Sequence, residues 1–234
     1  MWLFYAPDIE LTNELPQAEA VHAVRVLRLK EGDEISVTDG KGYMYKAVLT
    51  ACTPKRCLVH ITERSKQPDL WIGKICVAVA PTKMMDRNEW FVEKAVEIGV
   101  DRISFMKTCN SERCNINPER IERIAVSAMK QSYKATLPQF DNMISFNDIV
   151  KTPFDGVKCI AHLEPGRKQL LQDVLKPNTN ALVLIGPEGD FSPSEIEMAL
   201  ANGFEPVSLG PSRLRTETAA LVACHIANLK NQIS

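Results

Sequence analysis

Residues 184–192 read Leu-Ile-Gly-Pro-Glu-Gly-Asp-Phe-Ser, and residues 209–219 read Leu-Gly-Pro-Ser-Arg-Leu-Arg-Thr-Glu-Thr-Ala. In each stretch a glycine-proline turn follows a short apolar run and precedes a helix start. The apolar runs, 181–185 and 207–209, are too short for helices and are bounded by breakers, as buried strands are. Two successive strand-loop-helix units place their loops at the carboxyl ends of neighbouring strands, where open α/β sheets bind ligands. The functional site is therefore expected in these two loops.

The same alternation of strand and helix patterns extends over the chain from Lys74 onward. It predicts a mostly parallel sheet with helices on both faces. Ser192-Pro193-Ser194-Glu195 has the pattern of a capping box, and Thr216 is expected to be the N-cap of the last helix. The predicted strands of this part are 75–80, 102–106, 157–163, 181–185 and 206–209.

The N-terminal part of the chain is richer in β-strand signals. Strands are expected at 35–39, 43–51 and 58–62, joined by turn-forming segments, and residues 17–29 have helical spacing. This pattern is the outline of a small β-barrel. Because the polar stretch 64–69 separates the two patterns, we predict one domain over residues 1–68 and a second over residues 69–234.

The composition is that of a globular protein. With 45% hydrophobic and 24% charged residues in 234, the chain can bury a core and is not a disordered tail. Its net charge of −1 gives no global basic field that would indicate a nucleic-acid partner. Residues 102–134, however, hold seven Lys and Arg against three acidic residues. This excess suits either a phosphate-facing patch or a solvated helix face with ion pairs.

The seven cysteines are an odd number at irregular positions, which favours a reducing compartment over a disulfide framework. The spacing Cys-x4-Cys occurs twice, from Cys52 to Cys57 and from Cys109 to Cys114, but no histidine completes a zinc site, so no metal is expected. The apolar residues 1–5 lack a basic flank, and no apolar run reaches the roughly 20 residues of a membrane span. We therefore expect a cytoplasmic protein without a membrane partner.

Several catalytic motifs are missing: a Gly-x-Gly-x-x-Gly after a strand, a Walker lysine, a Gly-x-Ser-x-Gly elbow and a His-Glu-x-x-His. The four histidines are scattered, so a histidine triad or metal site has little support. Dehydrogenases, nucleotide hydrolases, serine hydrolases and metalloproteases are thus disfavoured. The two glycine-proline loops instead suit a ligand bound through main-chain groups, such as a nucleoside-bearing cofactor that brings its own reactive centre.

The two loops, Gly186-Pro187-Glu188-Gly189 and Leu214 to Ala219, resemble the signature segments of the RsmE group of the SPOUT RNA methyltransferases. Further segments match this group in the same order along the chain. They are His22, Arg25, Val26, Leu27 and Arg28; Gly32-Asp33; Lys83, Glu89, Lys94, Glu97 and Gly99; Ser111-Glu112-Arg113; and Gln131.

This resemblance implies a fold and an activity that composition and spacing do not. Members of the group have an N-terminal PUA-like β-barrel and a SPOUT-type α/β domain. Its mostly parallel sheet, with helices on both faces, carries a deep trefoil knot. They are homodimers, bind S-adenosylmethionine in the knot and methylate N3 of one uridine of 16S ribosomal RNA. The expected partners are therefore small-subunit ribosomal RNA, in an assembled particle, and a second copy of the chain.

By the same resemblance, three loops supply the cofactor contacts. The chain departs from the group's pattern at Asp190, where a second glycine is usual, at Lys130, where glutamate is usual, and at Ser212-Arg213. Because aspartate tolerates left-handed backbone, we expect the loop at Asp190 to keep its conformation. The cofactor-binding candidates are Leu163, Glu164, Ile185, Gly186, Pro187, Glu188, Gly189, Leu209, Gly210, Leu214, Arg215 and Thr216.

Uracil N3 is a weakly acidic imide, so the enzyme must expose the base and help to remove its proton. The catalytic candidates are Arg113 and Arg215, which would stabilise charge on the carbonyl oxygens, and Glu217, which would accept the proton. Glu188 is the alternative acceptor. Either glutamate could instead be a helix N-terminal carboxylate that accepts backbone N–H groups.

The RNA-binding candidates are all basic or imidazole side chains. His22, Arg25 and Arg28 fall at helical spacing on one face and suit phosphate contacts. No stacking aromatic residues interleave with them, so we expect recognition of folded RNA by shape and backbone. The full set is His22, Arg25, Arg28, Lys83, Arg113, Lys130 and Lys134.

Two other function classes stay open on the sequence alone. The chain could be an RNA-binding adaptor that kept the fold and lost catalysis. It could also be a small-molecule transferase, for which the basic segment and the extra barrel would have no purpose. Cofactor-dependent methyl transfer to RNA discriminates between these classes.

Overall fold

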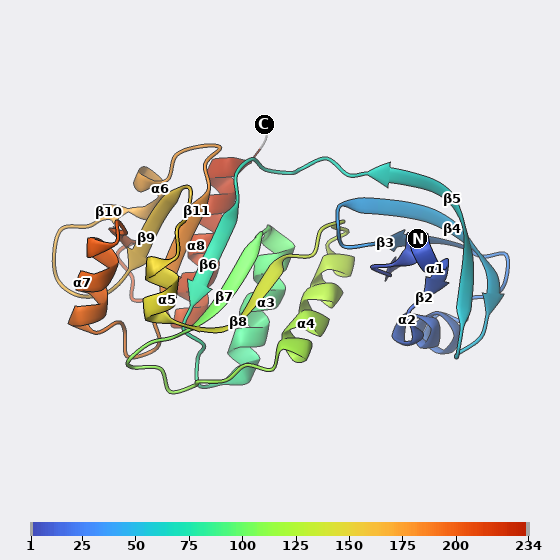
Figure 1. The fold of residues 1–234 in the computed structure, drawn as a ribbon, viewed down its shortest axis with the longest axis horizontal. Helices are drawn as coiled ribbons and strands as arrows, with labels where there is room; N and C mark the ends of the chain where they lie inside the picture. The colour runs from blue at the N-terminus through green and yellow to red at the C-terminus, as the bar shows by residue number, and fades with distance from the viewer. Residues whose placement is uncertain (1, 233–234) are drawn as a thin grey trace. The chain divides into compact units, whose positions relative to one another are not determined.

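The computed structural model describes residues 2–232, which divide into two compact units (Figure 1). The first unit comprises the chain up to Asp69 together with Val126–Leu137. The second comprises Leu70–Ala125 and the chain from Pro138 onward. The first unit is therefore assembled from two separate segments of sequence.

The described part of the first unit contains a five-stranded sheet in the order β1-β3-β4-β5-β2. The strands are β1 (Leu3–Tyr5), β2 (Glu14–Leu15), β3 (Glu34–Thr38), β4 (Tyr43–Cys52) and β5 (Cys57–Lys66). The antiparallel meander β3-β4-β5 is confirmed, with alternating residues such as Val37, Tyr45 and Leu49 in the core. The flanking strands β1 and β2 have three and two residues, too few to show alternation in the sequence.

The predicted helix over 17–29 is a short α-helix, α2 (Gln17–Val21), followed by a π-helix, η1 (His22–Val26). Another short helix, α1 (Ile9–Thr12), precedes them. Arg28 lies beyond η1 in left-handed backbone, with φ at +57°. A π-helix has a wider turn than an α-helix. The expectation that His22, Arg25 and Arg28 share one α-helical face is therefore wrong, although all three residues are exposed.

Helix α4 (Pro118–Gln131) belongs to the second unit in its first half and to the first unit in its second half. Within the first unit, Lys130 Nζ lies 2.6 Å from Glu19 Oε1. The Ala135 carbonyl accepts hydrogen bonds from the Thr38 hydroxyl at 3.1 Å and from the Gly42 N–H at 3.0 Å. These contacts attach the segment 126–137 to the β-sheet of the first unit.

The second unit contains a seven-stranded sheet in the order β10-β12-β9-β11-β6-β7-β8, in which every pairing is parallel. Each residue of the central strands β6 and β11 is buried, because both faces of the sheet are covered. The predicted parallel sheet is confirmed. Its strands are β6 (Ile75–Val79), β7 (Arg102–Lys107), β8 (Gln139–Ser145), β9 (Val157–Ala161), β10 (Gln169–Leu170), β11 (Ala181–Ile185) and β12 (Glu205–Ser208).

Helices α5 (Phe146–Lys151) and α7 (Pro193–Ala201) pack on one face of this sheet, in one cluster with Cys76 and Ala78 of β6. Because side chains alternate along a strand, the neighbouring residues of β6 face the opposite side. Helices α3 (Met85–Ile98) and α8 (Thr216–Asn231) lie there, packed on each other (Figure 1). The short helix α6 (Leu171–Val174) contacts α8.

The cysteine pair Cys52 and Cys57 lies opposite across β4 and β5, with the Sγ atoms 3.3 Å apart and both thiols free. Burial, and then the neighbouring Cys57, raises the pKa of the Cys52 thiol to about 12.

Within residues 2–232, no cluster of three or more His, Cys, Asp or Glu is placed to hold a metal ion. No helix of the same range has the length and apolar character to cross a membrane.

Candidate functional site

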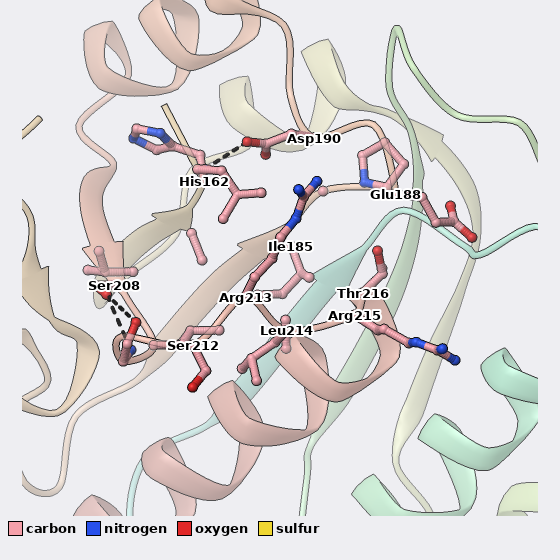
Figure 2. A pocket seen from close by; sticks show the side chains of 18 of the residues that line it. His162, Ile185, Glu188, Asp190, Ser208, Ser212, Arg213, Leu214, Arg215 and Thr216 are labelled. Carbon is pink, nitrogen blue, oxygen red and sulfur yellow. Dashed lines mark hydrogen bonds between the residues drawn. The ribbon is translucent and has the colours of Figure 1, made fainter. Parts of the chain in front are cut away.

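Three loops meet at the carboxyl ends of the adjacent strands β12, β9 and β11 (Figure 2). Together with the first turn of α8 they surround a cavity of about 460 Å³, a size typical of small-molecule sites. Two of the three loops are those of the glycine-proline turns, 186–190 and 209–215. The structure therefore brings the two signature segments together, with the loop after β9 between them.

Two glycines of these loops are required for different reasons. Gly210 has φ at +126°, in the left-handed region that favours glycine, and a Cβ there would meet nothing within 4 Å. A Cβ on Gly186 would lie 3.1 Å from the Phe191 ring and 3.3 Å from Asp190 Oδ1. Glycine is thus required at position 210 by the backbone conformation. At position 186 it is required because neighbouring side chains leave little room for a Cβ.

Asp190 ties two cavity loops together. Its Oδ2 accepts a hydrogen bond from the Leu163 N–H at 2.7 Å, and its Oδ1 accepts one from the Phe191 N–H at 2.8 Å. The residue has φ at +61°, the left-handed conformation that aspartate was expected to tolerate. Asn110 Nδ2 donates to the Gly189 and Asp190 carbonyls from the other side. The departure from glycine at Asp190 therefore adds a bridge between the loops after β9 and β11.

Glu188 is held by the loop that follows β6. Its Oε1 accepts a hydrogen bond from the Lys83 N–H at 3.0 Å. The guanidinium of Arg113 donates to the carbonyls of Thr82, at 3.1 Å, and Lys83, at 2.6 Å. Arg113 does not line the cavity, so the structure separates this catalytic candidate from Arg215. Arg113 instead holds the backbone at Thr82 and Lys83, and the Lys83 N–H is the group that donates to Glu188.

His162 lies at the opposite end of the cavity from Arg215 (Figure 2). Neither of its ring nitrogens has a hydrogen-bond partner within residues 2–232, and both are buried. Burial, followed by the nearby Lys168 ammonium, lowers the pKa of His162 below its ordinary value of 6.5. The imidazole is therefore neutral at pH 7, and its ring points away from the other lining side chains in Figure 2.

A second cavity, of about 440 Å³, adjoins the first, because Arg87 and Arg215 line both. Helix α3 supplies Asp86, Arg87 and Trp90, and the start of α8 supplies Glu217 and Thr218. The Glu217 side chain is 10% exposed, with Oε1 3.8 Å from Arg87 Nε. In the described part of the chain, no hydrogen-bond donor reaches Glu217 Oε2.

The helix starts near the site were predicted with mixed success. The capping box at Ser192 and Glu195 is confirmed, with both reciprocal hydrogen bonds present. The N-cap of α8, however, is Arg215, which has extended backbone and makes no side-chain capping bond. Thr216 is instead the first helical residue, so its expected capping role is wrong. In Figure 2 the Arg215 side chain points away from Asp190.

Most of the cofactor candidates lie at the first cavity. Of the others, Glu164 is exposed in the loop after β9, and Gly189 packs against Asn110. Those that line the cavity are Leu163, Ile185, Gly186, Pro187, Glu188, Leu209, Gly210, Leu214, Arg215 and Thr216. Ser212 and Arg213 also line the cavity, within the predicted loop from Leu209 to Thr216. The lining residues outside the predicted loops are Arg87, Ala161, His162, Asp190, Val207, Ser208 and Ala219. The adjacency of the strands that bring these segments together is not given by the sequence pattern.

The RNA-binding candidates are spread over both units. Lys83 Nζ is exposed and forms an ion pair with Glu112 at 2.9 Å. Lys130 is half-buried in its pair with Glu19, and Lys134 is half-buried and already engaged with other groups. Within 102–134, Arg102 also pairs with Asp141, and Arg120 pairs with Glu89. For Arg102, Arg120 and Lys130, ion pairs are therefore a better interpretation of the basic segment than a phosphate-facing patch.

Two family models match the chain. The model described as an RNA methyltransferase domain matches residues 70–228, and the model described as an RNA methyltransferase PUA domain matches residues 15–62. The second match identifies the β domain of the first unit as a PUA domain.

The chain also matches curated proteins named Ribosomal RNA small subunit methyltransferase E. That of Bacillus subtilis is 28% identical over 97% of this chain and 92% of its own length. That of Synechocystis is 31% identical over 94% of this chain and 75% of its own length.

Solved structures agree with these matches. A probable rRNA-methyltransferase from Porphyromonas gingivalis is 47% identical, with a TM-score of 0.93 and 98% of each chain covered. Ribosomal RNA small subunit methyltransferase E from Neisseria gonorrhoeae, bound to S-adenosyl methionine, is 29% identical, with a TM-score of 0.82, and 96% of this chain and 95% of that chain are covered. The predicted SPOUT-type α/β fold preceded by a PUA-like domain is thereby confirmed. The chain belongs to the ribosomal RNA small subunit methyltransferase E family.

Proposed function

We propose that this protein transfers a methyl group from S-adenosylmethionine to N3 of one uridine, the 1498 site, of 16S ribosomal RNA. Membership of the family supports methyl transfer to small-subunit ribosomal RNA. The observation that carries the proposal is the cavity formed by three backbone-rich loops at the carboxyl ends of β12, β9 and β11. Backbone-rich loops bind a cofactor by shape complementarity and by hydrogen bonds from main-chain groups to its polar atoms.

The first cavity fits S-adenosylmethionine in chemistry. Ile185 and Leu214 offer apolar surface for a purine, and Gly186 and Gly210 line the cavity without side chains of their own. Within the loop after β9, Leu163 lines the cavity beside the Asp190 bridge that holds this loop in place. The cofactor candidates named above, from Leu163 to Thr216, are proposed to hold it there.

When bound, S-adenosylmethionine supplies a methyl group that its positive sulfur already activates. The protein's own residues must then hold the base in line and assist the loss of its N3 proton. Arg215 lines both cavities, so its guanidinium is placed to stabilise charge on a base in the second cavity. We keep Arg215 and Glu217 as the catalytic candidates, with Arg113 acting on the loop that contacts Glu188.

The PUA unit is proposed to bind the RNA through phosphate contacts. His22, Arg25 and Arg28 are exposed in and after the π-helix η1. Lys83, Lys130 and Lys134 are weaker candidates, because each is already engaged with another group. We further propose that the substrate is an assembled small-subunit particle in the cytoplasm and that no metal takes part.

Methyl transfer by the purified protein tests this function. Small ribosomal subunits without the modification are incubated with protein and methyl-labelled S-adenosylmethionine, and the nucleosides are separated by mass spectrometry. We expect about one 3-methyluridine for each RNA molecule. RNA binding without transfer would instead support the adaptor, and labelling of small molecules alone would support the other transferase class.

We also propose that the protein is a homodimer, as the family resemblance implies. Leu221, Val222 and Ile226 of α8 stay half-exposed after the helix packs on the sheet, and Leu229 is 55% exposed. Apolar surface of this kind on one helix indicates an interface. Light scattering at micromolar concentration should give twice the mass of the 26.1 kDa chain. A fully active monomer would contradict the proposal.

A further inference from the structure

We propose that the second cavity is the pocket for the target uracil, in which Trp90 stacks on the base and Glu217 accepts a hydrogen bond from its N3–H. This inference rests on the proposed function, because it assumes that uracil is the base that is methylated. It adds the residues that recognise the base, which the first cavity does not contain.

The position of the second cavity suits a base that receives a methyl group from the first. Arg87 and Arg215 form a shared wall, so a molecule in one cavity lies beside a molecule in the other. The volume of about 440 Å³ lies within the range of small-molecule sites. The cavity is open to solvent and is lined by α3 and the start of α8, so a base that enters it must leave its stack.

Trp90 supplies the aromatic surface that sequence reasoning did not find near the basic residues. It lies on the same face of α3 as Asp86, four residues earlier, and the residue is 42% exposed. An exposed indole at the wall of a cavity gives a base a ring to stack on, whatever the sequence of the RNA. Stacking therefore supplies affinity, and the identity of the base must be recognised by polar groups.

Glu217 supplies a polar group that requires a partner. Its side chain is nine-tenths buried, and no donor reaches Oε2 within residues 2–232. Arg87 Nε, 3.8 Å from Oε1, is too far for a hydrogen bond. A carboxylate oxygen removed from water without a donor costs free energy, which an N–H group of a ligand would recover.

The Watson–Crick edge of uracil matches this arrangement. It presents a carbonyl, the N3–H and a second carbonyl in a row. The cavity offers the carboxylate of Glu217 with the guanidinium groups of Arg87 and Arg215 at its wall. Cytosine presents an unprotonated N3 instead, so its lone pair would face the carboxylate. The site should therefore bind uracil in preference to cytosine.

Glu217 also provides a route for the proton. The N3–H bond breaks as the Glu217 carboxylate takes the proton, and the electron pair left on N3 forms the bond to the methyl carbon. The bond from that carbon to sulfur breaks with both electrons on sulfur, so charge and atoms balance. The carboxylic acid of Glu217 then returns its proton to water.

Base discrimination tests the role of Glu217. Small subunits carrying uridine or cytidine at the target position are titrated with protein and S-adenosylhomocysteine, so that no methyl transfer occurs. The wild type should prefer uridine by roughly tenfold or more. In Glu217→Gln the amide can present either a donor or an acceptor, and the preference should fall to within about threefold. Glu197→Gln, on the exposed face of α7, should keep the wild-type ratio.

Fluorescence tests the role of Trp90 without use of activity. The chain has three tryptophans, so Trp2→Phe combined with Trp71→Phe leaves Trp90 as its one tryptophan. Incorporation of 7-azatryptophan at this position separates its fluorescence from that of tryptophans in ribosomal proteins. Subunits with uridine at the target should quench it, and subunits with an abasic target should not. Trp90→Leu should weaken binding about tenfold, while Trp90→Phe should restore most of the affinity.

Two results would overturn the inference while leaving the proposed function in place. One is full methyl transfer by a wild type that shows no preference for uridine over cytidine in binding. The other is Trp90 fluorescence that responds to protein concentration and not to RNA, which would place a second copy of the chain in the cavity. If the wild type transfers no methyl group to RNA, the proposed function itself is wrong.

Discussion

Replacing Gly186 with valine is expected to weaken S-adenosylmethionine binding roughly 100-fold, equivalent to about 2.7 kcal/mol. The first added carbon would lie 3.1 Å from the Phe191 ring and 3.3 Å from Asp190 Oδ1. Phe191 is fully packed in the core and cannot retreat, so Asp190 must move. Its bridge to the Leu163 N–H would then break, and the loops after β9 and β11 would separate. Calorimetric titration measures the loss.

Gly32→Val is the matched control for this variant. Gly32 lies in the first unit with φ at +93° and has open space around it. The same substitution there strains the backbone and lowers stability without touching the cavity, so cofactor affinity should be unchanged. If Gly186→Val folds, as judged by its thermal unfolding, and still binds with wild-type affinity, the 186–190 loop is only a connector.

Arg215→Ala is expected to lower turnover at saturating RNA by about 100-fold or more, with RNA affinity nearly unchanged. Arg215 lines both cavities, so its loss removes a cation from the place where charge develops on the base. Single-turnover kinetics with small subunits measures this rate. Arg167→Ala removes another exposed arginine from the same unit, outside both cavities, and should leave turnover intact.

Arg28→Ala should show the opposite behaviour, because Arg28 lies in the PUA unit and is proposed to bind phosphate. RNA affinity should fall and its salt dependence should become shallower by about one unit of slope. Arg28→Lys keeps the charge and should stay close to the wild type. If Arg28→Ala loses only turnover, or Arg215→Ala loses only RNA affinity, the assignment of binding to one unit and chemistry to the other is wrong.

The features that were predicted correctly from the sequence depend on neighbouring residues. The buried run 181–185 reads as a strand from its own composition, and the capping box at Ser192 needs only the carboxylate three residues later. Strand β8 (Gln139–Ser145) was missed because it pairs along one side only and is half-exposed, so it shows neither a buried run nor regular alternation.

The features that were missed depend on contacts between distant residues. The segment 126–137 joins the first unit through the Ala135 carbonyl, which bonds to Thr38, and no local pattern signals this contact. The π-helix at His22 likewise has no sequence signature that distinguishes it from an α-helix. At the site, Arg87 and Trp90 on α3 approach Glu217 only because α3 packs on α8. Their spacing from Glu217 along the chain gives no indication of this.

The loop residues of the cofactor candidates were predictable because the two glycine-proline turns are contiguous motifs that match a known group. The Asp190 bridge to Leu163 was not, since it joins loops after two strands whose adjacency is known only from the sheet order. The sequence motifs thus show which loops form the site, whereas the hydrogen bonds between those loops depend on which strands are neighbours.

Nucleoside mapping of small-subunit RNA from a strain that lacks this gene tests the central claim most directly. We predict that 3-methyluridine disappears from one position, the 1498 site, while every other modification is unchanged. Expression of the wild-type protein should restore it, and expression of Arg215→Ala should not. An RNA from the deletion strain that keeps its 3-methyluridine at that position would contradict the account.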